Sequence, residues 1–294
     1  MLVDVQEDFL QAVNERFSLI TRSPGVPHAA SVAEFAETLL HAFHALGHEA
    51  GLVTGRYGSG TNVVLSTTLT REALPDPPPR TIVFNMEQFD ARSPWFTERV
   101  RTILRECVVW DYNDRNLRNL QAAGLALCGF HVPVGYVPEM ARIEPAAVQD
   151  IDVLFYGSIN ARRAAVLQNL ANRQLKIVRA FNVYGAKRDA LIARAKVVLN
   201  VHYYEVKVFE IVRVSYLWTN RKAVVTEECP ESDIEPDLRE GLAIARYDEL
   251  PEVVEHLVRD DALRRALEDR GFEAFRRHPQ APSLARALEL LPWS

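Results

Sequence analysis

The 294-residue sequence has little cysteine and no paired cysteine motif. Cys107, Cys128 and Cys229 are odd in number and far apart, so they predict neither a disulfide framework nor a structural zinc site. We expect them to be reduced thiols in the core. The motifs G-x-G-x-x-G, G-x-x-x-x-G-K-[S/T], G-x-S-x-G and H-E-x-x-H are also absent. Their absence argues against Rossmann dehydrogenases, P-loop NTPases, classical serine hydrolases and zincins.

Long apolar runs and an excess of basic charge are missing as well. No run approaches the about 20 residues that a membrane helix needs. Acidic residues interrupt the helical spacing of residues 1–17, so we do not expect the apolar region of a secretory signal there. We therefore expect a cytoplasmic protein without a transmembrane segment. The net charge of -5 provides no general attraction for nucleic acid, so none is expected as a partner.

Short runs of Val, Ile and Leu alternate with amphipathic segments along the whole chain, and 48% of the residues are hydrophobic. This alternation is typical of parallel sheets that are covered by helices on both faces. The expected strands are 17–21, 49–55, 62–69, 81–87, 107–112, 151–158, 175–181, 196–204, 222–228 and 242–247. The expected helices are 32–47, 94–107, 113–124, 160–172, 187–195, 209–219, 250–260, 261–277 and 283–291.

The stretch 131–150 contains three prolines and has little periodicity, and we place the domain boundary within it, near residues 136–150. Because the alternating pattern begins again after it, we interpret this segment as a linker. The sequence thus predicts an α/β fold with two doubly wound, Rossmann-like domains that face a cleft, over residues 1–143 and 144–294. In such sheets the ligand binds at the carboxyl ends of the strands.

Two turns at these strand ends are candidate anion sites. In YGSINARR, Gly157 permits a tight turn, Ser158 can cap the helix, and Arg162 and Arg163 lie in its first two turns. Cations are unfavourable there unless an anion is bound, which suggests phosphate. Solvent-exposed arginines paired with surface carboxylates are an equally good explanation. The turn FNVYGAKRDA repeats the pattern, with Lys187 and Arg188 after Gly185.

A third candidate follows the expected strand 196–204. His202, Glu205, Lys207 and Glu210 lie within nine residues of one another. Each has an ordinary structural explanation, such as a buried histidine or a glutamate that stabilises a helix start. Their convergence at the mouth of a sheet favours a ligand.

In the N-terminal half, His28, Glu87 and Asp111 follow expected strands. Each could face the cleft as a general base, and each could instead cap a helix.

Residues 152–277 resemble the donor domain of GT-B glycosyltransferases, particularly the bacterial group 1 and CgeB-like proteins. The resemblance is carried by DVLFYGSINARR, by VVLNVHYYEVKVFEIVRVSYLWTNRKAVVTEE and by LAIARYDELPEVVEHLVRDDALRRALEDRGFEAF. That family has two glutamates separated by seven residues, and the second binds the nucleotide ribose. Glu210 matches the second, whereas His202 stands where the first would be. The family's glycine-rich loop between them is also absent.

This resemblance implies an enzyme that moves a sugar from a nucleoside-diphosphate sugar to an unknown glycan, lipid or small-molecule acceptor, without a cofactor or an obligatory metal. Domain 144–294 would bind the donor, and domain 1–143 would bind the acceptor. Glu87 and His28 are the catalytic candidates. The donor-binding candidates are Gly157, Ser158, Arg162, Arg163, Tyr184, Lys187, His202, Glu205, Lys207 and Glu210. Arg162, Arg163 and Lys207 would neutralise the diphosphate, Glu210 would hold the ribose, and Tyr184 would lie near the base.

Two alternatives stay open. A non-catalytic nucleotide-sugar-binding or assembly protein would explain the absent first glutamate and glycine-rich loop. A nucleotide-sugar epimerase would bind the same donor without an acceptor.

Overall fold

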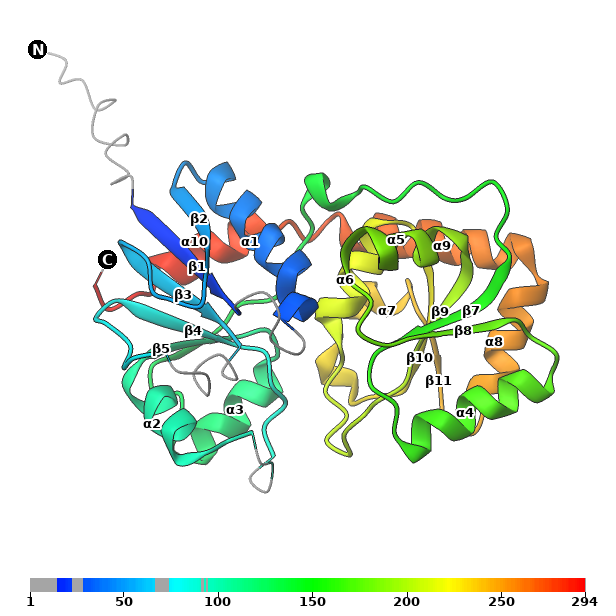
Figure 1. Ribbon diagram of the computed structural model, residues 1–294, viewed down its shortest axis with the longest axis horizontal. Coiled ribbons are helices and arrows are strands. Elements are labelled where there is room, and N and C mark those ends of the chain that lie inside the picture. Colours follow the sequence, from blue (N-terminus) through cyan, green and yellow to red (C-terminus); the bar gives the residue numbers. More distant parts are fainter. Residues whose placement is uncertain (1–14, 23–28, 67–73, 91–92, 94, 294) are drawn as a thin grey trace, which may run out of the picture.

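The structure is a computed structural model that describes residues 15–22, 29–66, 74–90, 93 and 95–293. It contains two parallel β-sheets, each in its own half of the molecule (Figure 1). The expected α/β fold with two doubly wound halves is therefore confirmed. Within the described residues, no helix is long and apolar enough to span a membrane.

The first sheet has six strands in the order β2-β1-β3-β4-β5-β6, and every neighbouring pair is parallel. Helices α1 and α10 cover one face, and α2 and α3 cover the other. The strands are β1 (Arg16–Thr21), β2 (Glu49–Thr54), β3 (Thr61–Leu65), β4 (Thr81–Asn85), β5 (Val108–Asp111) and β6 (Gly129–His131). The helices are α1 (Ala33–Ala45), α2 (Glu98–Glu106), α3 (Asp114–Ala122) and α10 (Gln280–Glu289).

The second sheet has five parallel strands in the order β11-β10-β9-β7-β8. Helices α5, α6 and α9 pack on one face, and α4 and α8 pack on the other. The strands are β7 (Ile151–Tyr156), β8 (Ile177–Ala180), β9 (Ala195–Asn200), β10 (Ala223–Glu227) and β11 (Ala243–Ala245). The helices are α4 (Ala161–Asn172), α5 (Gly185–Arg194), α6 (Ile211–Thr219), α7 (Pro236–Arg239), α8 (Leu250–Arg259) and α9 (Asp261–Phe275).

The C-terminal helix joins the two halves. Helix α10 follows the helices of the second sheet in the chain, yet it lies beside α1 on the first sheet (Figure 1). Leu284 and Leu291 are buried in the apolar core of the first sheet. Gln280 fixes the place where the chain crosses from the second half back to the first. Its side chain accepts from the backbone N–H of Gly135 at 2.6 Å and donates to the carbonyl of Pro133 at 3.1 Å. Both sheets therefore depend on the C-terminal segment.

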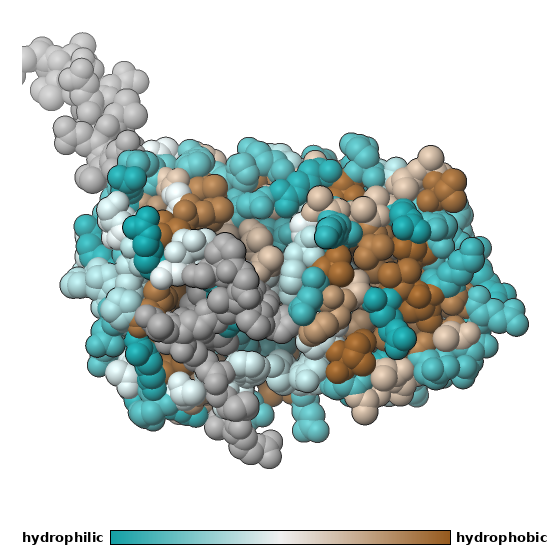
Figure 2. All heavy atoms as spheres, in the orientation of Figure 1, coloured by the Kyte–Doolittle hydropathy of each residue, from teal (hydrophilic) through white to brown (hydrophobic). Residues whose placement is uncertain are grey.

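Apolar side chains are also visible on the outside of the half that holds the second sheet (Figure 2). The exposed large apolar residues of this half include Val148, Ile159 and Phe181. Scattered apolar residues of this kind are normal on protein surfaces, so only those that gather at a cavity call for a functional explanation.

Candidate functional site

A cavity of about 710 Å³ lies between the two halves. The first sheet contributes residues that follow β3 and β4, including Ser66 and Glu87. The second sheet contributes Tyr156, which ends β7, and Phe181, which follows β8. Because all strands within each sheet are parallel, carboxyl ends from both sheets open into the same space. Its volume is in the usual range for a small-molecule site.

The turn after β7 forms one wall of the cavity. Gly157 has a φ of +130°, and its N–H donates to the carbonyl of Ala180 at 3.0 Å. A Cβ atom at this position would lie 3.1 Å from Nη2 of Arg213 and 3.7 Å from Nη1 of Arg163. Glycine therefore lets the backbone approach two guanidinium groups closely. The helix cap is Asn160 and not Ser158 as expected, because the Asn160 side chain accepts from the N–H of Arg163 at 2.9 Å.

Arg163 is buried beside this turn, with 3% of its surface exposed. Its guanidinium donates to the carbonyl of Val201 at 2.8 Å, to that of Ser158 at 3.0 Å and to Oε1 of Glu210 at 3.0 Å. Burial lowers the pKa of Arg163, and the carboxylate of Glu210 opposes this change. The side chain thus connects the β7 turn, the end of β9 and the start of α6.

Glu210 lies between two arginines at the start of α6. Its second oxygen, Oε2, is 3.5 Å from Nη1 of Arg213, whose guanidinium also donates to Oδ1 of Asn200 at 2.9 Å. Two positive groups and one carboxylate leave a net charge of about +1 next to Gly157. An anionic ligand would be attracted to such a position.

Arg162 and Lys207 point to a different carboxylate, Glu227, at the end of β10. Glu227 is fully buried, forms an ion pair with Arg162 through both of its oxygens, and has Nζ of Lys207 2.9 Å from Oε1. Burial raises the pKa of Glu227, but the hydrogen bonds from Arg162 and Lys207 outweigh it and hold the pKa below its usual value. Neither of these cations is among the residues that line the cavity. The sequence did not indicate Glu227, because its partners are distant in the chain.

His202 lies in the same group of charges and is 1% exposed. Its backbone N–H donates to Oε2 of Glu227 at 3.2 Å, while neither ring nitrogen has a hydrogen-bond partner among the described residues. Burial lowers the pKa of His202, which favours the neutral ring. Glu205 is exposed and lines a separate shallow hollow with Asp90 and Val206.

On the β8 side of the cavity, Arg188 takes the place expected for Lys187. Lys187 is exposed, whereas Arg188 is buried and its Nη2 lies 2.7 Å from Oε1 of Glu34 in α1. The spacing between Arg188 and the buried Ile192 is one helical turn, so helix periodicity could have selected Arg188. Tyr184, which precedes α5, does line the cavity.

Glu87 faces the cavity from the first sheet, and Oγ of Ser66 donates to its Oε1 at 3.3 Å. A buried network holds its backbone. The side-chain amides of Asn85 and Asn116 donate to the carbonyl of Glu87 at 2.9 and 3.0 Å, and to Oδ2 of Asp111 at 2.7 and 2.8 Å. Burial raises the pKa of Asp111 to about 7, against the effect of these hydrogen bonds. Asp111 therefore positions the Glu87 loop and does not itself reach the cavity. His28 lies outside the described residues.

Several aromatic residues that line the cavity were not among the candidate site residues, although Tyr203 and Tyr204 lie in the polar stretch that follows the expected strand 196–204. Tyr112 directly follows β5, and burial raises the pKa of its hydroxyl, with further contributions from Asp111, Glu210 and Glu87. Tyr112 lines the same cavity as Glu87 of the first half and Glu210 of the second. Trp95 and Tyr204 also line the cavity, and their rings come from opposite halves. Their positions next to strand ends or helix starts were visible in the sequence, but the partner half was not.

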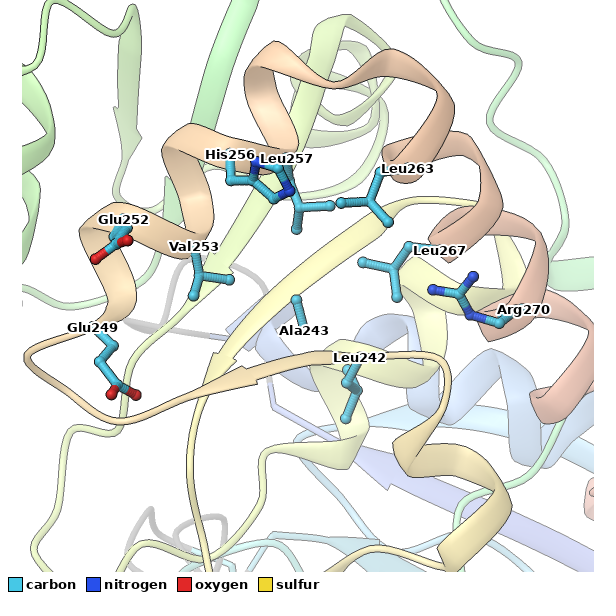
Figure 3. Close-up of a pocket in the computed structure, with 10 residues that line it drawn as sticks. All are labelled: Leu242, Ala243, Glu249, Glu252, Val253, His256, Leu257, Leu263, Leu267 and Arg270. Atoms are coloured by element: carbon cyan, nitrogen blue, oxygen red, sulfur yellow. The ribbon is translucent and has the colours of Figure 1, made fainter.

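A second hollow, of about 420 Å³, lies between β11, α8 and α9 (Figure 3). Figure 3 shows Leu257, Leu263 and Leu267 pointing into it from the two helices, while the charged side chains stand at its margin. It is away from the carboxyl ends of the first sheet, and the polar groups of its described lining residues do not converge. The cavity between the halves is therefore the better candidate site.

Two parallel α/β halves with a shared cavity at their strand ends define a GT-B type of fold, as expected. Solved structures share it. The protein is similar to WaaG, a glycosyltransferase involved in lipopolysaccharide biosynthesis, at a TM-score of 0.64 and 11% identity over 95% of this chain and 100% of that one. It is similar to sucrose-phosphate synthase from Thermosynechococcus elongatus at a TM-score of 0.61 and 11% identity, over 94% and 97% of the chains. It is also similar to a mutant of T4 phage BGT in complex with UDP-glucose, at a TM-score of 0.60 and 11% identity over 94% and 99% of the chains.

No family model matches the sequence. Among curated proteins it is 21% identical to Uncharacterized protein L137 of Acanthamoeba polyphaga mimivirus over 196 residues, which are 65% of this chain and 26% of that protein. It is 30% identical to Uncharacterized protein L138 of the same virus over 105 residues, or 35% of this chain and 12% of that protein. The chain thus spans a small part of these two relatives. The similarity to the solved structures supports the fold.

Proposed function

We propose that the protein is a glycosyltransferase that moves a sugar from a nucleoside-diphosphate sugar to an acceptor. The observation that carries this proposal is the Gly157 turn, where backbone, Arg163 and Arg213 converge beside the carboxylate of Glu210 in a cavity shared by both sheets. A diphosphate would bind the guanidinium groups, and Glu210 would accept hydrogen bonds from the ribose hydroxyls. The similar structure of the T4 phage BGT mutant contains UDP-glucose, which agrees with this ligand.

In the proposed reaction an acceptor oxygen attacks C1 of the donor sugar. The bond between C1 and the phosphate oxygen breaks, and the nucleoside diphosphate leaves with the electron pair. Arg163 and Arg213 would stabilise the charge that develops on the leaving group, so we propose that no metal is required. If the configuration at C1 is inverted, Glu87 is the candidate to take the proton of the acceptor hydroxyl.

Membership of the group 1 or CgeB-like glycosyltransferases and a cytoplasmic location are parts of this proposal. So is the division into an acceptor domain, 1–143, and a donor domain, 144–294, with the qualification that α10 packs on the first sheet. The net charge of -5 makes nucleic acid an unfavourable acceptor.

Mass spectrometry of the protein incubated with UDP-, GDP- and TDP-sugars in EDTA tests the function. Release of the nucleoside diphosphate with hydrolysis or transfer of the sugar is expected, and Glu87→Gln should reduce transfer without reducing nucleotide binding. Binding without turnover would identify a non-catalytic nucleotide-sugar-binding protein. An isomerised sugar on an intact nucleotide would identify an epimerase, and the absence of binding would refute all three functions.

A further inference from the structure

Three aromatic side chains line the cavity without belonging to a hydrophobic core. Trp95, which precedes α2, is 37% exposed, and Tyr203, which follows β9, is 39% exposed. Tyr204 beside it is half-buried. None of the three packs into the apolar cores that the described residues form on the faces of the two sheets. Burial of apolar surface within the chain therefore does not explain these rings.

These residues, which we name the aromatic cluster, are held in place by contacts from both halves. Nε1 of Trp95 donates to the hydroxyl oxygen of Tyr204 at 3.2 Å. The rings of Tyr203 and Tyr204 meet edge to face, with centroids 5.0 Å apart and an interplanar angle of 72°. The guanidinium carbon of Arg163 lies 5.2 Å from the centroid of Tyr203. A fixed set of rings loses little entropy when a ligand packs on it.

Sheet order places the aromatic cluster on one side of the proposed diphosphate site. β7, which ends at the Gly157 turn, lies between β8 and β9. Tyr203 and Tyr204 follow β9, whereas Phe181 and Tyr184 follow β8 on the other side. A nucleotide that crosses the Gly157 turn can therefore place its base on one side and its sugar on the other.

Glu87, the candidate general base from the first sheet, lies on the same side of the Gly157 turn as the aromatic cluster. The Gln88 side chain donates to the carbonyl of Val208 at 3.2 Å and accepts from the N–H of Val208 at 3.3 Å, which ties the Glu87 loop to the segment after β9. Burial raises the pKa of Tyr204, and the nearby carboxylate of Glu87 adds to this rise. The acceptor hydroxyl has to reach Glu87, and it therefore has to enter the cavity on the side of the aromatic cluster.

We infer that the aromatic cluster binds the sugar ring of a glycan acceptor, an inference that rests on the proposed transfer function. A sugar ring has C–H groups on its faces and hydroxyl groups around its edge. Its faces can pack on Trp95 and Tyr203. Its hydroxyls can form hydrogen bonds with polar residues that line the same cavity, namely Glu87, Gln88 and Ser66. A lipid chain forms no hydrogen bonds with these polar groups, so it would remove them from water without compensation, which is unfavourable.

Calorimetric titration with maltotriose, cellotriose and chitotriose, each with and without UDP, tests this inference. At least one of these glycans should bind the wild-type protein. Trp95→Ala and Tyr203→Ala should each weaken its binding by up to about tenfold, which corresponds to about 1.4 kcal/mol for the loss of a stacking ring. Trp95→Phe keeps a ring and should restore most of the affinity. UDP affinity should stay within about twofold in the two Trp95 variants, since Trp95 belongs to the first half, whereas the Tyr203 ring packs on Arg163 of the proposed diphosphate site.

Phe181→Ala is the matched control, because it removes an exposed ring from the same cavity on the other side of the Gly157 turn. It should leave glycan affinity unchanged. Failure of every glycan to bind while UDP binds would overturn the inference and leave the donor proposal intact. An equal loss of UDP and glycan affinity in Trp95→Ala would assign the cluster to the nucleotide base. Glycan binding without any nucleotide binding would overturn the acceptor role together with the proposed function.

Discussion

Replacing Arg163 by lysine separates its role at the proposed diphosphate site from simple positive charge. The guanidinium makes hydrogen bonds to Val201, Ser158 and Glu210 at 2.8 to 3.0 Å. The lysine ammonium is a single compact group without the planar fork of arginine, so it cannot reach all three acceptors together. The loss of two hydrogen bonds should reduce the free energy of unfolding by about 1 to 3 kcal/mol. The displaced turn should also bind UDP about tenfold more weakly.

Arg162→Lys is the matched control one residue earlier. Its charge would still face Glu227, which keeps Lys207 as a second partner, and neither cation lines the cavity. UDP affinity should therefore be unchanged within about twofold. Isothermal titration with UDP and thermal unfolding of the apo proteins measure both effects. Wild-type UDP affinity in Arg163→Lys, or an equal loss in Arg162→Lys, would refute the assignment of Arg163 to the diphosphate site.

Three further variants test neighbouring parts of the site. Glu210→Gln should bind UDP about tenfold more weakly but should bind 2′,3′-dideoxy-UDP like the wild type, because glutamine lacks the second acceptor oxygen; equal losses for both nucleotides would contradict ribose binding. Gly157→Ala places a methyl group 3.1 Å from Arg213 at a positive φ, so UDP titration should show at least tenfold weaker binding, and unchanged affinity would refute a close approach of ligand to this turn. The pKa of Asp111 is raised from 3.8 to about 7, so its contribution to stability is complete below pH 3.8 and is lost as the pH rises through 7. Relative to Asp111→Asn, the wild type should lose up to about 4 kcal/mol of unfolding free energy between pH 4 and 8 in denaturant titrations, and a pH-independent difference would contradict the buried titration.

The sequence predicted the strands that are buried on both faces and the helices with a clear apolar stripe. β3 and β4 are continuous runs of buried residues, and they end within a few residues of the expected positions. β6 was missed because it has only three residues, begins with glycine, and is stabilised by pairing with β5. Strand pairing of this kind is a tertiary property that local periodicity does not encode.

The crossing of α10 to the first sheet was also not predictable from periodicity. Its apolar stripe indicates that it packs on something, but the same stripe would fit either sheet. The specifying contacts are the hydrogen bonds of Gln280 to Gly135 and Pro133, which join residues about 145 positions apart. A sequence shows which surface must be buried, and the partner that buries it is fixed by the whole fold.

The same limit explains why the candidate site was predicted in outline and not in its pairings. Both Arg162 and Arg163 lie at the start of α4, and the sequence treats them alike. Successive helix residues point about 100° apart, so one guanidinium reaches Glu210 beside the cavity and the other reaches Glu227 at the end of β10. The cations of this site therefore have carboxylate partners before any nucleotide binds. A diphosphate has to share Arg163 and Arg213 with Glu210, which weakens the ion pairs of Glu210. Glu210 would then accept hydrogen bonds from the ribose hydroxyls, and these bonds compensate for the weakened ion pairs. On this reasoning, inorganic pyrophosphate, which has the charge but no ribose, should bind much more weakly than UDP, and equal affinities would show that charge alone determines binding.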